Sequence, residues 1–409
     1  MRILLVNTRH FYGGGDSTYT FNLAKVLRNK GHDVAFFAMQ DDRNLPDPDS
    51  DLFVNHIDFK ELNQKKSIYA GLQVASRVIY SKEARKKISK LLDRFQPDIV
   101  HLQNIHGHIT PSVILEGRRR NLPVVWTLHD YKMVCPNTHF LIDGTNKICE
   151  ACGNAQYYQA VLKRCKKGSV LASTMACVEA YAHRIMGLRN LPDYFLTPSA
   201  FLRNKLIERG FSPSKVKHVP LFLPAEMFDD VGQHDKGYLL FIAKLDPLKG
   251  IYPLLEACRQ APEVRLKIAG RADDIIAAKL PSLLPPNAEY VGMKQGDDLR
   301  QLLLGARVVV LPSLWYENQP FSITEAFAAG KPVIASDLGG MTELVKDGEL
   351  GLLVPPGDVK ALVEAMRWVV DHAKEAKDMG QSAREYALRE HSAERHYERI
   401  MEVYGSVMH

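Results

Sequence analysis

Short apolar runs alternate with longer segments of helical periodicity along almost the whole chain. Many of these runs are apolar at every position, which is typical of strands in a parallel sheet whose two faces are covered by helices. The alternation therefore predicts an α/β fold with two doubly wound domains in tandem. The expected strands are residues 2–7, 33–38, 98–102, 124–128, 194–198, 216–220, 238–243, 264–270, 288–292, 307–312, 332–336 and 352–356.

A polar, aperiodic stretch at 228–237 interrupts the alternation, and we place the linker near it, at 223–237. The length of 409 residues also favours two hydrophobic cores rather than one. The expected domains are 1–225 and 238–389. Residues 131–190 do not follow the rhythm and are interpreted as an insertion in the first domain that contains at least one long helix. A helical pattern closes the chain, and residues from about 390 to 409 are expected to pack back on the first domain.

The net charge of +6 suits anionic small molecules or a membrane surface and does not require nucleic acid. Neither a signal peptide nor a spanning helix is indicated by the apolar runs, so the expected location is the cytoplasm.

The segment after the strand 307–312 combines two carboxylates with a helix start. Glu317 follows the carboxyl end of this strand, where doubly wound sheets bind ligands. Asn318 is a suitable helix cap, Pro320 fits a first helical turn, and Gly330 ends the helix. A helix of this kind is expected to begin at the ligand-binding edge of the second domain.

The unpaired N–H groups at such a helix start form an anion site for a phosphate. Here they belong to Gln319, Phe321 and Ser322, and Glu325 lies further along the same helix. Two acceptor groups beside an anion site suit a nucleotide sugar, which carries hydroxyls on both sides of its diphosphate. The alternative is that Glu317 and Glu325 are ordinary solvated acids near a helix start.

The run "YENQPFSITEAFAAGKPVIASDLGG" resembles the signature of the family 4 retaining glycosyltransferases of the GT-B fold, glycosyl transferases group 1. Three further segments, "LLFIAKLDPLKGI", "LKIAGRA" and "NTRHFYGGGDSTYTFNLAKVLRNKGHDV", extend the resemblance to both halves of the chain. It implies two Rossmann-like domains that face each other across a cleft, with the donor held mainly by the second domain and the acceptor by the first.

The resemblance also implies roles for single residues. Glu317 would bind donor-sugar hydroxyls and stabilise positive charge at the anomeric carbon, and Glu325 would accept from ribose hydroxyls. Lys244 and Lys249 would neutralise the leaving diphosphate, which is the charge stabilisation that this step needs. The donor site would be completed by Gly14, Gly15, Val291, Met293, Asn318, Gln319, Pro320, Phe321 and Ser322.

The sequence departs from the family pattern at two positions. Lys244 stands where members commonly have arginine, and a lysine lacks the two-pronged guanidinium contact with phosphate. Ala272 stands where glycine is frequent, so the backbone is expected to approach the ligand less closely.

In the first domain, the run Gly13–Gly15 follows the first strand, without the G-x-G-x-x-G spacing of nicotinamide enzymes. His129 and Asp130 follow the strand 124–128, and the resemblance implies that His129 hydrogen-bonds the donor sugar. We assign His129 and Glu317 as stabilisers of the reacting sugar and neither as a general base, since a leaving phosphate oxygen can take the acceptor proton.

Two further motifs concern acceptor and metal. His106 and His108 are expected to contact the acceptor or to pack within their loop. The Asp-x-Asp spacing in "DPDSD" (47–51) lies outside any nucleotide-binding context, so it is interpreted as coincidence and transfer is expected to require no cofactor or metal.

The insertion contains four cysteines with the spacing C-x13-C-x2-C-x12-C: Cys135, Cys149, Cys152 and Cys165. Four thiolates around a structural zinc would stabilise a segment without a core of its own. The alternative is a set of scattered buried thiols. Cys177 and Cys258 are expected in the core.

Basic clusters at 65–66, 85–87, 118–120 and 163–167 all fall in the first domain. Together with the segment 69–80 they are compatible with peripheral contact to anionic lipid headgroups, although solvated helix faces explain each cluster by itself.

The sequence therefore predicts a retaining hexosyltransferase that moves a sugar from a nucleotide diphosphate sugar, with UDP as the expected nucleotide. The acceptor would be a glycan or a lipid-linked molecule in cell-surface polysaccharide assembly. Two alternatives stay open: a nucleotide-sugar epimerase of the same fold, and a regulator that binds a sugar nucleotide without turnover.

Overall fold

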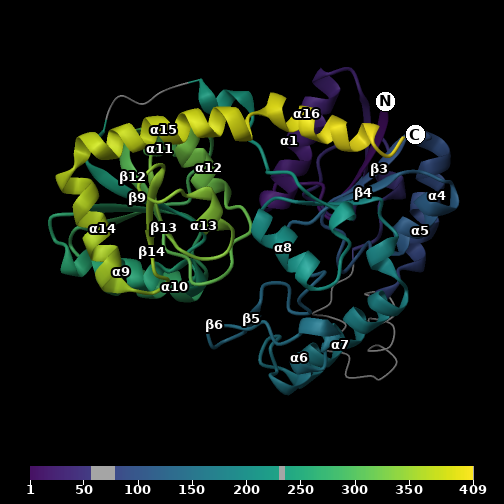
Figure 1. Cartoon of the computed structure of the whole chain (residues 1–409), viewed down its shortest axis with the longest axis horizontal. Coiled ribbons are helices and arrows are strands. Elements are labelled where there is room, and N and C mark those ends of the chain that lie inside the picture. The colour runs from purple at the N-terminus through teal and green to yellow at the C-terminus, as the bar shows by residue number, and fades with distance from the viewer. Residues whose placement is uncertain (57–78, 230–234, 409) are drawn as a thin grey trace. The chain divides into compact units, whose positions relative to one another are not determined.

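A computed structural model describes residues 1–56, 79–229 and 235–408. The chain divides into two compact units, one formed by Met1–Val219 with Tyr397–His409 and the other by Pro220–His396. Each unit contains a six-stranded sheet with helices on its faces (Figure 1). The predicted doubly wound α/β architecture of both halves is thus confirmed, and every expected strand is present within two residues of its expected bounds.

The sheet of the first unit is fully parallel, with the strand order β2-β1-β3-β4-β7-β8. The chain leaves β1 for β2 on one side and returns to β3 on the other, so the strand order reverses between β1 and β3. The strands are β1 (Arg2–Val6), β2 (Asp33–Phe37), β3 (Ile99–Leu102), β4 (Val124–Thr127), β7 (Tyr194–Thr197) and β8 (Val216–His218). Among the described residues of this unit, the helices before and after the insertion are α1 (Gly15–Asn29), α4 (Lys82–Phe95), α5 (Ser112–Arg119) and α8 (Ala200–Glu208), and α16 (Ala393–Gly405) closes the chain.

The second unit repeats this plan with the strand order β11-β10-β9-β12-β13-β14, again all parallel. Side chains of β9 alternate between two cores: Leu239 and Phe241 lie in one, and Tyr238 and Leu240 in the other. Because both faces are buried, the strand is apolar throughout. The strands are β9 (Tyr238–Ile242), β10 (Arg265–Ala269), β11 (Ala288–Gly292), β12 (Ala306–Leu311), β13 (Val333–Ser336) and β14 (Gly351–Val354). The helices are α9 (Ile251–Gln260), α10 (Asp274–Leu283), α11 (Gly296–Gly305), α12 (Phe321–Ala328), α13 (Gly340–Leu344), α14 (Val359–Asp371) and α15 (Ala373–His391).

The insertion contains the expected long helix, α7 (Val170–Ile185), preceded by the short helix α6 (Gln159–Leu162). An antiparallel hairpin of β5 (Leu141–Ile142) and β6 (Lys147–Ile148) precedes them. Sequence periodicity did not indicate this hairpin, because two-residue strands are too short to show alternation.

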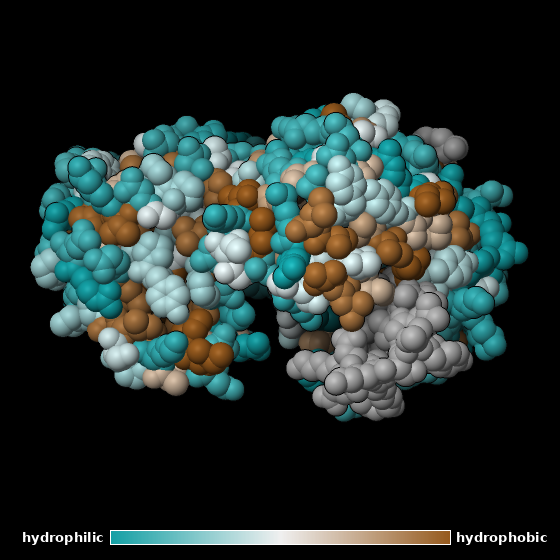
Figure 2. All heavy atoms as spheres, turned by 90° about the horizontal axis from the view of Figure 1, so that it is seen from below, coloured by the Kyte–Doolittle hydropathy of each residue, from teal (hydrophilic) through white to brown (hydrophobic). Residues whose placement is uncertain are grey.

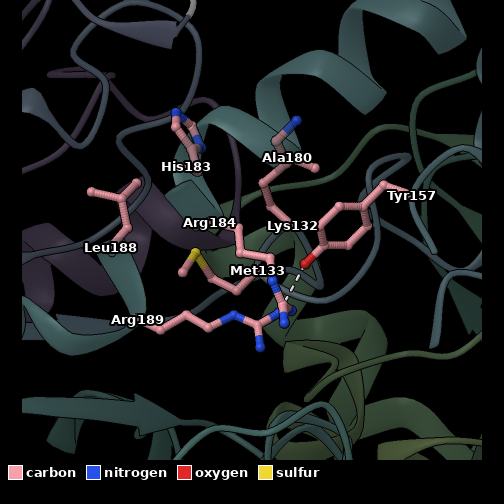
Figure 3. A pocket seen from close by; sticks show the side chains of 8 residues that line it. All are labelled: Lys132, Met133, Tyr157, Ala180, His183, Arg184, Leu188 and Arg189. Atoms are coloured by element: carbon pink, nitrogen blue, oxygen red, sulfur yellow. Dashed lines mark hydrogen bonds between the residues drawn. The ribbon is translucent and has the colours of Figure 1, made fainter. Parts of the chain in front are cut away.

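The insertion encloses a cavity of about 30 Å³ (Figure 3). Arg189 donates a hydrogen bond to the Tyr157 hydroxyl at its wall, and Lys132 pairs with the buried Glu179 at 2.6 Å. The cavity is lined by Lys132, Met133, Tyr157, Ala180, His183, Arg184, Leu188 and Arg189. These contacts join separate segments of the insertion to one another.

The closing helical pattern is divided at Ser392, whose backbone is extended (φ −71°, ψ 154°). Helix α15 ends before it, and α16 (Ala393–Gly405) follows. Within the first unit, the hydroxyl of Tyr404 on α16 lies 2.6 Å from Nδ1 of the buried His101 on β3. Six short 3-10 helices complete the described chain: Ser50–Leu52, Gly153–Ala155, Leu188–Asn190, Pro213–Lys215, Ala225–Phe228 and Pro247–Lys249. In the part of the chain that the structure describes, no helix has the length and apolar character needed to cross a bilayer.

Candidate active site

The strand order of the second sheet reverses between β9 and β12, and an ion pair lies at this point. Lys249 follows β9, Glu317 follows β12, and Lys249 Nζ lies 2.6 Å from Glu317 Oε1. In open α/β sheets, ligands bind at the carboxyl ends of the strands where the strand order reverses. The fold thus brings together two of the residues that the sequence predicted for the donor site.

Glu317 is held by three donors that all point at the same carboxylate oxygen. Besides Lys249, the Ser313 hydroxyl donates to Oε1 at 2.9 Å and the Trp315 indole N–H at 2.7 Å. The ammonium of Lys249 also lies 5.2 Å from the centre of the Trp315 ring. The side chain of Glu317 is 7% exposed, so its charge is fixed in place rather than solvated. This geometry argues against the reading of Glu317 as an ordinary surface acid.

Ser313 and Trp315 were not predicted from sequence. Their only signal was their position between the end of β12 and Glu317, which does not say where a side chain points.

Close backbone packing fixes the loops that carry this pair. Gly250, directly after Lys249, has φ +78°, and a Cβ there would lie 1.8 Å from the carbonyl oxygen of Pro312. Gly340 donates its N–H to the carbonyl of Glu317 at 2.8 Å, and a Cβ on Gly340 would lie 1.8 Å from the carbonyl oxygen of Asn318. Glycine is therefore required sterically at both positions.

We expect Gly340→Ala to destabilise the second unit by about 1–3 kcal/mol, the usual cost of forcing an extra methyl group into a packed site. The measurement is chemical denaturation followed by the far-UV signal. Gly405→Ala is the matched control, because nothing lies within 4 Å of a Cβ at that helical position. Equal stability of Gly340→Ala and the wild type would contradict the close packing.

Helix α12 begins two residues later than predicted, at Phe321. Pro320 is its N-cap rather than part of the first turn and makes no side-chain cap hydrogen bond, so the assignment of Asn318 as the N-cap was wrong. Proline is compatible with this position because the cap N–H has no role inside the helix. The N–H groups of Phe321 and Ser322 lie in the first turn, where donors have no acceptor within the helix.

The side chain of Gln319 has a structural role. Its amide accepts from the Leu221 N–H at 2.7 Å and donates to the Leu221 carbonyl at 3.1 Å. A contribution of Gln319 to an anion site would therefore come from its backbone.

Glu325 lies on α12, one turn beyond its first residue, and is partly exposed. Burial of the carboxyl raises its pKa to about 7. Such a group is easily ionised or protonated near neutral pH, and a ligand whose hydroxyls donate to it favours the ionised form.

The raised pKa of Glu325 predicts a pH-dependent stability. A carboxyl with a pKa near 7 when folded and about 4.5 when unfolded stabilises the fold fully below about pH 4.5. This contribution is lost as the pH rises through 7. We expect the wild type to lose on the order of 2 kcal/mol more than Glu325→Gln between pH 5 and pH 8, measured from denaturation curves at both values. Parallel pH profiles would show that Glu325 does not have this pKa.

Lys244, Val291 and Met293, also predicted for the donor site, follow or end strands of the same sheet and are more exposed than Glu317. Lys244 follows β9, is 50% exposed and pairs with Asp246 at 3.2 Å. Val291 lies near the end of β11 and is partly buried, whereas Met293 just beyond it is 56% exposed. Ala272 follows β10, where Leu245 bridges to it.

In the first unit, polar groups gather where the strand order reverses between β1 and β3. Gly14 precedes α1 as its N-cap, Gly15 is its first residue, and Asp16 lies in its first turn. The side-chain amide of Asn104, after β3, donates to Asp16 at 3.3 Å. Asp16 and Asn104 were not predicted.

His129 follows β4 as predicted, and a 2.8 Å hydrogen bond joins its Nε2 to Oε1 of Gln103 after β3. Burial lowers the pKa of His129 to about 4, partly offset by the charge of Asp16. The imidazole is therefore neutral at pH 7. A neutral ring can exchange hydrogen bonds with a sugar and carries no charge of its own.

Comparison with known proteins decides the family. The profile of Glycosyltransferase Family 4 matches residues 13–226, about half of the chain, and that of Glycosyl transferases group 1 matches residues 225–386. The chain belongs to glycosyltransferase family 4. The predicted membership and enzyme class, a glycosyltransferase, are thereby confirmed.

Several relatives and solved structures resemble this glycosyltransferase. A 42.6 kDa protein of the cps region of Klebsiella pneumoniae is 25% identical over 362 residues, 84% of this chain and 87% of the relative. The MMP alpha-(1->4)-mannosyltransferase of Mycolicibacterium hassiacum is 29% identical over 213 residues, 49% of this chain and 50% of the relative.

Two solved structures establish the GT-B fold. Anabaena HepE in complex with UDP superposes with a TM-score of 0.67 at 16% identity, covering 99% of this chain and 100% of HepE. The sucrose-phosphate synthase of Thermosynechococcus elongatus gives 0.69 at 19% identity, covering 99% and 98%.

The two histidines predicted for acceptor contact have different surroundings. His106 packs its ring 5.6 Å from that of Trp126, its Nδ1 is buried without a partner, and burial lowers its pKa well below the usual value. His108 lies 5.6 Å from the ring of His56. An acceptor contact by either residue stays a prediction.

The loops of the glycosyltransferase that carry the four cysteines are brought together. The amide of Asn137, two residues after Cys135, donates to the Cys165 carbonyl at 2.8 Å, and the Cys149 N–H donates to the carbonyl of Phe140 at 2.7 Å. Burial, together with the nearby thiols of the other three cysteines, raises the pKa of the Cys152 thiol to about 12.

Burial raises the pKa of the Cys135 thiol, and the backbone N–H groups of residues 137–140 offset part of this rise. All four cysteines are free thiols, and among the described residues no three or more His, Cys, Asp or Glu side chains form a group arranged to hold a metal ion. The structural zinc thus stays a prediction from spacing. Cys177 and Cys258 are buried, as predicted.

The cysteine spacing predicts about one zinc per chain in protein purified without chelator, since four thiolates satisfy tetrahedral zinc. Elemental analysis measures it. We expect Cys152→Ser to lose the metal, whereas Cys177→Ser, a buried thiol outside the set, retains it. Wild-type protein that contains no metal while these four cysteines are free, reduced thiols would contradict the site.

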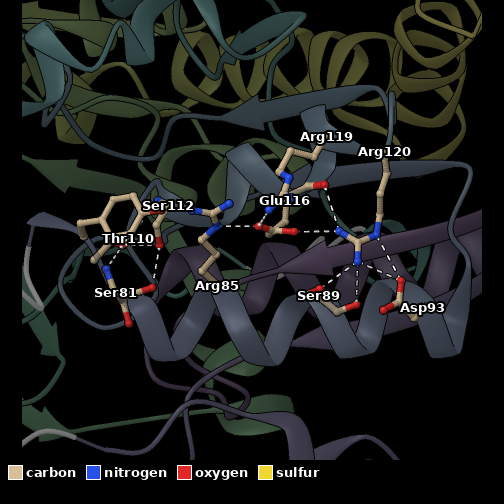
Figure 4. Close-up of polar contacts among 10 residues, drawn as sticks. Ser81, Arg85, Ser89, Asp93, Thr110, Ser112, Glu116, Arg119 and Arg120 are labelled. Carbon is tan, nitrogen blue, oxygen red and sulfur yellow. Dashed lines mark hydrogen bonds and ion pairs between the residues drawn. The ribbon is translucent and has the colours of Figure 1, made fainter.

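Most arginines of the predicted basic clusters take part in ion pairs (Figure 4). Arg85 and Arg120 hold the buried Glu116 from both sides, and Arg120 also reaches Asp93 at 2.9 Å. Arg118 pairs with Asp193 at 2.8 Å. These side chains join α4 to α5, and α5 to the residue that precedes β7, which is a structural role. The cluster at 65–66 and most of the segment 69–80 lie outside the described residues.

The carboxylates of residues 47–51 are likewise engaged. Arg94 pairs with Asp49 at 2.9 Å and with Asp51 at 3.0 Å, and the buried Asp47 lies 3.5 Å from His10.

Proposed function

We propose that this glycosyltransferase moves a hexose, with retention of anomeric configuration, from a UDP-sugar to a glycan or lipid-linked acceptor in cell-surface polysaccharide assembly. The observation that carries the proposal is the ion pair between the buried Glu317 and the partly exposed Lys249, where the second sheet reverses its strand order. Beside it begins α12, which also carries Glu325.

The donor fits these groups by charge. The diphosphate would accept hydrogen bonds from the N–H groups of Phe321 and Ser322 at the positive end of the α12 dipole. Lys249, and more loosely the exposed Lys244, would neutralise the charge that grows on the leaving phosphate. Glu325 would accept hydrogen bonds from the ribose hydroxyls. Val291 and Met293 would border the base.

Glu317 would act on the sugar. Its fixed negative charge is suited to donor hydroxyls and to the positive charge that develops at the anomeric carbon as the bond to phosphate breaks. A carboxylate held by three donors needs little reorganisation during the reaction. This favours stabilisation over nucleophilic attack as its role.

For the first unit we propose contacts with the sugar and the acceptor. His129 is neutral at pH 7, which suits hydrogen bonding to sugar hydroxyls and not the uptake of a proton. A phosphate oxygen of the leaving group would then take the acceptor proton. Gly14 and Gly15, at the start of α1, offer backbone N–H groups to the diphosphate.

The names of relatives support the biological setting and the nucleotide. One relative lies in the cps region of Klebsiella pneumoniae, and another is an amylovoran biosynthesis glycosyltransferase of Erwinia amylovora, 28% identical over 187 residues. Anabaena HepE was solved with UDP and with UDP-glucose. These names favour UDP and a polysaccharide product for this chain.

The test is a panel of nucleotide sugars, scored by thermal shift and by donor hydrolysis without acceptor. We expect UDP and at least one UDP-sugar to raise Tm more than GDP or ADP sugars do, with slow release of the sugar. Isomerisation of the donor sugar without acceptor would indicate an epimerase instead. Binding without turnover across a broad acceptor panel would indicate a regulator.

A further inference from the structure

Helix α7 of the insertion exposes large apolar side chains along one side. Leu171 is 72% exposed, Val178 46% and Ile185 85%. Residues seven apart on an α-helix lie within about 20° of one another around its axis, so the three form a single stripe. The opposite side of α7 is buried and includes Ser173, Ala176, Cys177, Glu179 and His183.

The apolar stripe is extended by two neighbours. Leu162, at the end of α6, is 71% exposed, and Val170, at the start of α7, is 48% exposed. Among the described residues, thirteen large apolar side chains are exposed, and six of them fall between Tyr158 and Ile185. Figure 2, seen from the side on which α6 and α7 lie in Figure 1, shows apolar side chains gathered on this part of the first unit.

Exposed cations flank the stripe. Lys163, Arg164 and Lys167 lie in the segment between α6 and α7, and Arg184 precedes Ile185. The sole acid in residues 158–187 is Glu179, which is buried and paired with Lys132 at 2.6 Å. We call the five apolar residues (Leu162, Val170, Leu171, Val178, Ile185) and the four cations (Lys163, Arg164, Lys167, Arg184) the insertion face.

We propose that the insertion face docks this glycosyltransferase on the surface of a bilayer that contains anionic lipids. Apolar side chains in the middle of a basic helical surface are the arrangement by which peripheral proteins enter the headgroup region. The apolar side chains would lie among the upper acyl chains, and the long Lys and Arg side chains would extend to the lipid phosphates.

The charge favours a bilayer over a protein partner. The insertion face carries four exposed cations, and the acid beside it, Asp143, is 28% exposed and accepts from the Lys167 N–H at 2.7 Å. This positive excess is complementary to a negative surface, whereas protein interfaces usually carry charges of both signs around an apolar centre. The proposal rests on the proposed function in one respect: docking would serve a lipid-linked acceptor. The binding itself is independent of transfer and can be measured without substrates.

The experiment is co-sedimentation of the full chain with two kinds of vesicle. One kind contains phosphatidylcholine alone, and the other contains phosphatidylcholine with about 30% of the anionic lipid phosphatidylglycerol. We expect binding to the anionic vesicles that weakens as salt is raised, because exposed charges are screened. Each cation near the surface strengthens binding about fivefold. Lys163→Glu with Lys167→Glu should therefore weaken it at least about tenfold.

A second variant tests the apolar stripe. Leu171→Ser with Ile185→Ser should weaken binding at least about tenfold, because both side chains would leave the acyl region. Ile275→Ser, on α10 of the second unit, is the matched control: its side chain is 70% exposed and should not affect binding. Tm of every variant checks the fold, and all replaced residues are exposed.

Equal binding of wild type and both double variants, or no binding to anionic vesicles, would overturn the proposal. The protein could instead fail to bind vesicles and form concentration-dependent dimers that the serine variant abolishes. This result would assign the insertion face to contact with a second copy of the chain. Loss of vesicle binding with donor hydrolysis intact would separate docking from the chemistry. Failure of donor binding would leave the vesicle result unchanged.

Discussion

Replacement of Glu317 by glutamine should lower the rate of sugar transfer about 100-fold or more, while UDP affinity changes only a few-fold. Loss of one preorganised electrostatic contact to a transition state typically costs this much. Glutamine retains the shape and an acceptor oxygen for Ser313 and Trp315, so the local packing survives. It removes the negative charge that we propose to act on the anomeric carbon and leaves Lys249 without its counter-charge.

The measurement is kcat with the best donor and acceptor of the panel, together with Kd for UDP. Glu263→Gln is the matched control, because Glu263 lies in the same unit and pairs with Arg367 at 2.6 Å on the surface. A Glu317→Gln enzyme with wild-type kcat would remove Glu317 from the chemistry.

Replacement of Lys249 by alanine has the second large expected effect: at least about tenfold lower kcat and weaker binding of UDP. Lys249 would neutralise the leaving diphosphate and is held against Glu317 and the ring of Trp315. Lys244→Ala should have a smaller effect, since Lys244 is half exposed and pairs with Asp246. Steady-state kinetics measures the effect of each variant on kcat, and titration with UDP measures its effect on nucleotide binding.

The two residues should also act as one unit. In the double variant of Glu317→Gln and Lys249→Ala, the loss of kcat should be well below the product of the two single losses, because groups in contact are not additive. Multiplicative losses would show that Glu317 and Lys249 work independently. A larger loss of kcat for Lys244→Ala than for Lys249→Ala would show that Lys244, and not Lys249, is the main cation at the diphosphate.

The strands were the most predictable part of the fold. Strands such as β9 and β12 are buried on both faces, so their apolar runs leave a strong signal in the sequence, bounded by turns. The hairpin β5–β6 was missed because each strand has two residues. The break between α15 and α16 was missed because the extended backbone of Ser392 interrupts the helix, whereas the apolar periodicity of the sequence continues past it.

The candidate site was predictable at the level of position along the chain. Glu317 and Lys249 both follow strands that end at the same sheet edge, and this much can be read from the order of strands. That they form an ion pair could not, because it depends on side-chain direction and on the close approach of Gly250 and Gly340 to neighbouring carbonyls. For the same reason Ser313 and Trp315 escaped prediction, and Asn318 was wrongly assigned as the cap.

The most direct test of the central claim is a crystal structure of this glycosyltransferase with UDP. We expect the diphosphate within hydrogen-bond distance of the N–H groups of Phe321 and Ser322, Lys249 on its oxygens, and the ribose hydroxyls on Glu325. A nucleotide bound away from the amino end of α12, with Glu317 and Glu325 remote from it, would contradict the account.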